Sequence, residues 1–145
     1  MQKRDIEFLA VLFDELVPPR EDRKLAGAGR SEIVATVQEK IDAVPDLAKL
    51  IDAGMAAIQK QAEQRGAAFQ SLPHEQRVEV LRSVEAAQPF FMPLLLLHVY
   101  GSYYQQPDVL TAQGYPARPL FPEGHDLESD DEALLEKLRA RIGRP

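Results

Sequence analysis

The feature that most constrains the fold is an apolar segment in the second half of the chain. Residues 89–99 read PFFMPLLLLHV, with apolar side chains at almost every position. The run contains Pro93 and is about half the ~20 residues that a membrane span needs, so we expect no span. A helix that is apolar on nearly every side is usually buried on most sides. We therefore predict that a helix over residues 89–104 is the central element of a core.

Prolines and glycines divide the preceding residues into amphipathic segments. Apolar residues recur at helical spacing, which predicts helices over residues 4–17, 31–43, 47–65 and 73–87. The charged residues 20–30 between the first two helices predict a mobile loop.

Individual residues support these boundaries. Pro18 stops the first helix, Ser31 is a candidate N-cap, and Pro73 fits the first turn of the helix that it opens. Gly66 suits the left-handed position that follows a helix end. Gly54 lies inside a predicted helix at a cost of about 1 kcal/mol against Ala, and close approach of another backbone would account for it.

The last third of the chain changes character. Residues 105–128 contain four prolines together with apolar side chains that can be buried, which predicts a long ordered loop. Residues 129–132, Ser-Asp-Asp-Glu, match a capping box and predict a helix over residues 130–142. No alternating strand pattern occurs. We therefore predict a single all-α domain over residues 1–145, a compact bundle of five or six helices with a long C-terminal loop.

Charge and composition exclude several functions. The net charge of −6 offers no basic stripe for a nucleic acid. The chain has no cysteine, so disulfides, thiolate metal sites and cysteine nucleophiles are excluded.

Four stretches in a fixed order carry a family resemblance. They are LFDELVPP at residues 12–19, SEIVATVQEKI at 31–41, F-x-x-L-P-x-E-x-R at 69–77 and HVYGSYYQQP at 98–107. This order resembles the gluconate 2-dehydrogenase subunit 3 family.

The resemblance implies a function and a set of partners. Members of that family look like small helical subunits without a cofactor or catalytic activity of their own. Their implied partners are a flavin-bearing dehydrogenase subunit and usually a multihaem cytochrome c, and they support folding, export or stability of the flavoprotein. Members commonly begin with a twin-arginine export signal, whereas here only Lys3-Arg4 precede the first helix. We expect a cytoplasmic protein as sequenced, or a periplasmic one if an export signal precedes it.

Candidate catalytic and metal-binding residues are few. His98 lies on the apolar helix without a carboxylate at helical spacing, which favours a packed, hydrogen-bonded histidine, and His74 is expected to be solvated. His125, Asp126 and Glu128 could offer ligands to a divalent ion, but they also fit a turn before an acidic helix. Adjacent carboxylates such as Asp14-Glu15 do not share a helix face, so no acid–base pair follows. A small metal-dependent enzyme that uses His98 or the segment 123–128 is an alternative function.

Aromatic residues give the strongest indication of a binding surface. Aromatic side chains with polar tips are enriched at interfaces, and they equally pin loops onto a bundle. Two partners fit such a surface: a dehydrogenase subunit, or a second copy of a stand-alone protein. The candidate partner-binding residues are Tyr100, Tyr103, Tyr104, Tyr115 and Phe121.

Overall fold

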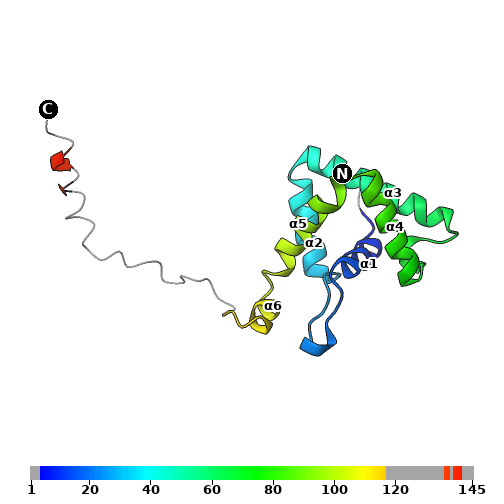
Figure 1. Cartoon of the computed structure of the whole chain (residues 1–145), viewed down its shortest axis with the longest axis horizontal. Helices are drawn as coiled ribbons and strands as arrows, with labels where there is room; N and C mark the ends of the chain where they lie inside the picture. The colour runs from blue at the N-terminus through cyan, green and yellow to red at the C-terminus, as the bar shows by residue number, and fades with distance from the viewer. Residues whose placement is uncertain (1–3, 117–135, 138, 142–145) are drawn as a thin grey trace.

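The computed structural model of the chain describes residues 4–116, 136, 137 and 139–141. Over these residues the fold is all-α, as predicted, and has no β-strand (Figure 1). Residues 136, 137 and 139–141 are helical, within the helix predicted over 130–142. The elements are α1 (Ile6–Leu16), η1 (Glu21–Arg23), α2 (Ser31–Asp42), α3 (Pro45–Gln64), η2 (Phe69–Ser71), α4 (His74–Ala87), α5 (Phe91–Tyr103) and α6 (Pro107–Ala112), where η denotes a short 3₁₀ helix.

The helix boundaries follow the proline and glycine pattern closely. α1 ends at Leu16, before Pro18. Gly66 has φ +92°, which confirms the left-handed position predicted after α3. Two details are wrong by one residue: Ser31 is the first helical residue rather than the N-cap, and Pro73 is the N-cap residue rather than part of α4. Such shifts are expected, because capping sequences locate a helix end only to within one or two residues.

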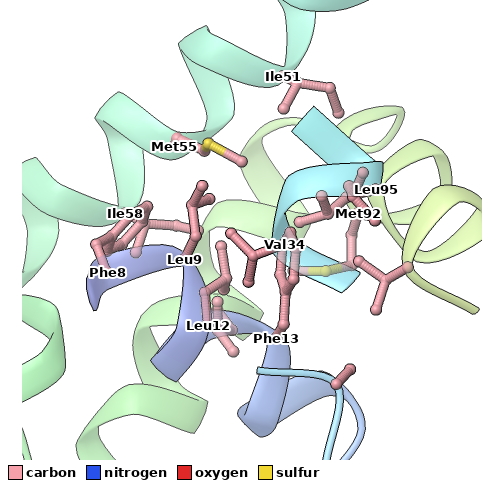
Figure 2. Packing of buried hydrophobic residues seen from close by; sticks show 14 of the residues in the cluster. Phe8, Leu9, Leu12, Phe13, Val34, Ile51, Met55, Ile58, Met92 and Leu95 are labelled. Atoms are coloured by element: carbon pink, nitrogen blue, oxygen red, sulfur yellow. The ribbon is translucent and has the colours of Figure 1, made fainter. Parts of the chain in front are cut away.

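The hydrophobic core gathers around α1. Figure 2 shows four α1 side chains, Phe8, Leu9, Leu12 and Phe13, among side chains of α2, α3 and α5. All four are at most 2% exposed. Full burial of one large apolar side chain contributes roughly 1.5–3 kcal/mol, so this cluster is a main source of stability. α2 and α3 pack against each other and against α5, and α3 also packs against α4.

The prediction that the helix over residues 89–104 is the central element, buried on most sides, is wrong. α5 buries Phe91, Leu95 and Val99 where it packs on α2 and α3. The opposite side carries large apolar residues that remain exposed. Apolar residues occupy every side of this helix, so the sequence could not indicate which side its neighbours would cover. We call the exposed residues the α5 face: Phe90, Leu97, Tyr100 and Tyr104, which are 74%, 65%, 40% and 46% exposed.

Arg4 joins the start of the described chain to two helices. Its Nη1 lies 2.7 Å from Asp42 Oδ1 at the end of α2, and its Nε lies 2.7 Å from Asp52 Oδ1 in α3. The Arg4 side chain is only 8% exposed. A guanidinium that binds two carboxylates in this way positions α1 firmly against the α2–α3 pair.

None of the helices over the described residues is by itself long and apolar enough to cross a membrane. α4 and α5 meet the length and composition criteria only as a pair, and this pair is bent by 119°.

Gly54 lies where α3 meets α5. A Cβ atom at this position would overlap the ring of Phe91, which is 1% exposed. The sequence predicted close approach of another backbone, and this is wrong: the neighbour is an aromatic side chain. The missing side chain of Gly54 is therefore what allows the Phe91 ring to lie directly on α3.

Replacing Gly54 with alanine tests this contact. Overpacking costs about 1–3 kcal/mol, and the better helix propensity of alanine recovers about 1 kcal/mol. We therefore expect the free energy of unfolding to fall by up to about 2 kcal/mol in urea titrations followed by circular dichroism. Gly101→Ala is the matched control, because a Cβ there meets no atom within 4 Å and should stabilise the helix slightly. Equal stabilisation by both substitutions would contradict the account.

Candidate functional site

The segment between α1 and α2 folds back on itself as a narrow hairpin (Figure 1, blue). Arg20 and Leu25 exchange two backbone hydrogen bonds, with N···O distances of 2.8 and 3.0 Å. At its base, the amide of Gly29 donates to Asp14 Oδ1 over 2.7 Å. The mobile loop predicted over residues 20–30 thus has a defined path, because it makes its own hydrogen bonds and others to α1. We call residues 17–30 the hairpin.

Tyr103 attaches the end of α5 to this hairpin. Its side chain is 3% exposed, and its hydroxyl donates a hydrogen bond to the Ala26 carbonyl over 3.2 Å. The guanidinium carbon of Arg30 lies 5.7 Å from the centre of the Tyr103 ring, within the range of a cation–π contact. Burial raises the pKa of the Tyr103 hydroxyl, so the ring stays neutral and keeps its donor at physiological pH.

The short helix α6 lies beside the hairpin and the end of α5. The predicted loop over residues 105–128 is wrong here, because residues 107–112 form α6. Pro107 at the first helical position and Asp108 in the first turn are both favourable for helix initiation, so the sequence does carry a local signal for α6. Val109 is 1% exposed, so α6 is anchored by an apolar side chain. Asp108 Oδ2 accepts from Arg30 Nη1 over 2.9 Å.

Arg30 is therefore the charged residue at the place where the end of α5, the hairpin and α6 meet. It lies between the Tyr103 ring and the Asp108 carboxylate, and its side chain is 23% exposed. Its Nε and Nη2 atoms are buried and have no hydrogen-bond partner among the described residues. Only Nη1 of Arg30 pairs with α6, so the guanidinium is held mainly by the Tyr103 ring and the Asp108 carboxylate.

The end of α5, the hairpin and α6 form the walls of an open cleft of about 250 Å³. Its lining is largely apolar and aromatic, and its charged members are two arginines. We call this cleft the groove. It is lined by Leu16, Val17, Pro18, Arg20, Arg23, Leu25, Tyr100, Tyr103, Tyr104, Val109 and Gln113.

The rim of the groove carries two half-exposed tyrosines. The ring centres of Tyr100 and Tyr104 are 6.0 Å apart, and Tyr104 packs edge-on against Tyr103 at 5.3 Å. Both rim residues also belong to the α5 face, so the groove and that face form one continuous surface. Such a surface is suited to contact with another protein, because exposed apolar patches rimmed by polar groups typically mark interaction sites.

Comparison with known proteins identifies the family. The family model for gluconate 2-dehydrogenase subunit 3 matches residues 3–123 of the 145-residue chain. The chain belongs to this family. No curated protein and no solved structure matches the chain. The matched residues include all six labelled α-helices and every residue that lines the groove.

The predicted partner-binding residues of this family member divide into three groups. Tyr100, Tyr103 and Tyr104 come together at the groove, Tyr103 as a pin and the other two as exposed rim residues. Tyr115 is 60% exposed and does not line the groove. Phe121 lies outside the described residues. Both interpretations of the aromatic residues thus remain, pinning for Tyr103 and an accessible surface for Tyr100 and Tyr104.

Within the described residues, no three His, Asp or Glu side chains are grouped in a way that could hold a metal ion. His125, Asp126 and Glu128 lie outside the described residues. His98 is partly buried on α5.

Glu15 instead forms a structural contact that the sequence did not predict. Its carboxylate, 6% exposed, accepts from Arg77 Nε over 2.5 Å and lies 2.9 Å from His74 Nδ1. Its neighbour Asp14 binds the hairpin, so the two carboxylates face different partners, as expected for adjacent residues on a helix. The prediction of a solvated His74 is only partly right, because its ring is 71% exposed yet touches Glu15.

The Glu15 contact leads to a stability prediction. Glu15→Gln removes the charge that Arg77 and His74 share, and we expect the free energy of unfolding to fall by about 1–2 kcal/mol. The matched control is Glu79→Gln, which removes the exposed partner of Arg65 and should change stability by less than about 1 kcal/mol. Urea unfolding of the parent protein, Glu15→Gln and Glu79→Gln measures both changes in stability. Equal losses in the two variants would contradict a special role for Glu15.

The Tyr103 hydrogen bond leads to a second prediction. Tyr103→Phe keeps the ring but loses the hydroxyl, which should lower the free energy of unfolding by about 0.5–1.5 kcal/mol near neutral pH. Tyr115→Phe is the control, since that side chain is 60% exposed.

The raised pKa of Tyr103 adds a pH dependence to this prediction. Because the folded-state pKa lies above the unfolded value of about 10, the contribution of the neutral hydroxyl is fully present below pH 10. It is lost as the pH rises through the folded-state pKa. Unfolding titrations above pH 10 should therefore show a steeper loss of stability in the parent protein than in Tyr103→Phe, and parallel curves would contradict the assignment.

Proposed function

We propose that the chain is a non-catalytic accessory subunit that binds the flavin-bearing subunit of a sugar or sugar-acid dehydrogenase and supports its folding or stability. The observation that carries the proposal is the family match over residues 3–123. In this proposal the chain contributes a binding surface, and the partner supplies the oxidation chemistry.

The α5 face supports a role in protein contact. Large apolar side chains that remain exposed in an isolated subunit lose that exposure when a partner covers them, which provides a driving force of about 25 cal/mol per Å² of apolar area. Phe90 and Leu97 are 74% and 65% exposed, so most of their surface is available for such a contact. Tyr100 and Tyr104 extend the same surface to the groove, and tyrosine is among the residues most enriched at interface hot spots.

Purification of the tagged chain from its native host tests the proposal. We expect a flavoprotein dehydrogenase to be enriched, and loss of the chain's gene to lower the amount or activity of that dehydrogenase. If no flavoprotein is enriched and dehydrogenase activity is unchanged, the proposal fails. Static light scattering of the purified chain tests the competing possibility, a homo-oligomer formed through the same surface.

A pair of apolar-to-acid substitutions locates the contact. Leu97→Asp places a charge in the centre of the α5 face, and we expect at least a tenfold loss of the retained flavoprotein because an unpaired charge would be buried. Val44→Asp is the matched control, because Val44 is 50% exposed at the start of α3, outside the α5 face. Circular dichroism should show both variants folded. Equal retention by Leu97→Asp and the parent protein would exclude this face as the contact.

A further inference from the structure

The groove differs in charge from the rest of the molecule. The chain has 17 Lys and Arg against 23 Asp and Glu, a net charge of −6. Yet among the described residues Arg20 and Arg23 are the only charged ones that line the groove, so this lining carries a charge of +2. Two other clefts of similar size are lined in part by carboxylates: Asp5 and Asp52 in one, Asp14 and Glu15 in the other.

The two arginines differ in how far they are already neutralised. Arg20 binds Asp22 of the hairpin, with Nη2 2.7 Å from Oδ2. Arg23 is exposed and has no acidic partner within 4.0 Å in the described part of the chain. An incoming carboxylate can therefore pair with Arg23 without displacing an existing ion pair.

The remaining lining selects an apolar side chain. The floor is formed by buried or half-buried residues such as Leu25, Tyr103 and Val109, and Tyr100 and Tyr104 rise at the rim. The volume of about 250 Å³ is below the roughly 300–1,000 Å³ typical of small-molecule sites. A shallow aromatic cleft of this size suits one large side chain presented by another chain.

From this combination we infer that the groove binds an acidic linear segment of a partner protein, through one large apolar side chain flanked by carboxylates. The apolar side chain packs against the rings of Tyr100 and Tyr104, and a neighbouring carboxylate pairs with Arg23. The inference rests on the proposed function in one respect, that the segment belongs to the larger dehydrogenase subunit. It adds the chemistry by which that subunit is recognised.

A peptide titration tests the recognition without any dehydrogenase. The probe is the peptide Gly-Glu-Asp-Phe-Glu-Asp-Gly with capped ends and a fluorescein label, titrated with the full chain and followed by fluorescence polarisation. We expect saturable binding that weakens between about 50 and 300 mM salt, because the contact is partly electrostatic. Analogues with Gln and Asn for the acids, or Ser for Phe, carry the same label and should bind at least fivefold more weakly.

Charge reversal on the protein locates the probe. Arg23→Glu should weaken binding of the acidic peptide about fivefold or more, since an attractive rim contact becomes a repulsive one. Lys49→Glu is the matched control: it changes the net charge equally at a residue of α3 whose side chain is 80% exposed, and it should leave binding unchanged. Absence of binding, equal binding of the neutral analogue, or equal effects of the two substitutions would each overturn the inference. A dimer in light scattering that Arg23→Glu abolishes would also overturn it, because a second copy would then occupy the groove.

A cross-linking experiment identifies the natural segment. The chain has no cysteine, so Gln113→Cys provides a single thiol at the groove for a photoreactive benzophenone label. In the complex from the native host, the cross-linked partner peptide should contain a large apolar residue beside Asp or Glu, while a label at Val44→Cys should not capture it. A basic or wholly polar peptide would overturn the inference. If peptide binding succeeds but no flavoprotein is found, the proposed function fails and the recognition chemistry stands.

Discussion

The contact between Gly54 and Phe91 determines how α5 lies on the bundle. The Phe91 ring occupies the space that a Cβ on α3 would need, so the first turn of α5 lies directly on the α3 backbone. From that starting point, α5 buries Leu95 and Val99 and turns the side that carries Leu97 away from the core. The exposed α5 face is thus a result of where the helix is anchored, because its composition alone allows any side to be buried.

A second set of contacts holds together the end of α5, the hairpin and α6. Tyr103 donates to the Ala26 carbonyl, Arg30 lies against the Tyr103 ring, and Asp108 of α6 pairs with Arg30. None of these contacts is strong alone, since a neutral hydrogen bond contributes only about 1 kcal/mol. They share residues, however: Tyr103 takes part in the first two contacts and Arg30 in the last two. Each contact therefore fixes a side chain that the next contact needs. The groove depends on this chain of contacts for its shape.

The sequence predicted the family, the all-α class and the helix bounds to within a few residues, because prolines, glycines and 3.6-residue periodicity are local signals. It also named Tyr100, Tyr103 and Tyr104 as pinning or partner-contact residues, without indicating which residue takes which role. The sequence did not predict the features that depend on contacts between distant residues. These are the side of α5 that is covered, the path of the hairpin, and the participation of Arg20 and Arg23 in the groove. The helix at Pro107 was missed although its local signal was present, because the prolines that follow it favoured a loop.

The groove is assembled from residues 16–25, 100–104 and 109–113, which are far apart in the chain. No single segment contains enough of it to be recognised, so the groove exists only after α6 has docked on the folded bundle. A partner that binds this groove consequently distinguishes the fully folded chain from one in which α6 has not docked. Under the proposed function, complete folding of this chain is therefore a condition for binding its partner.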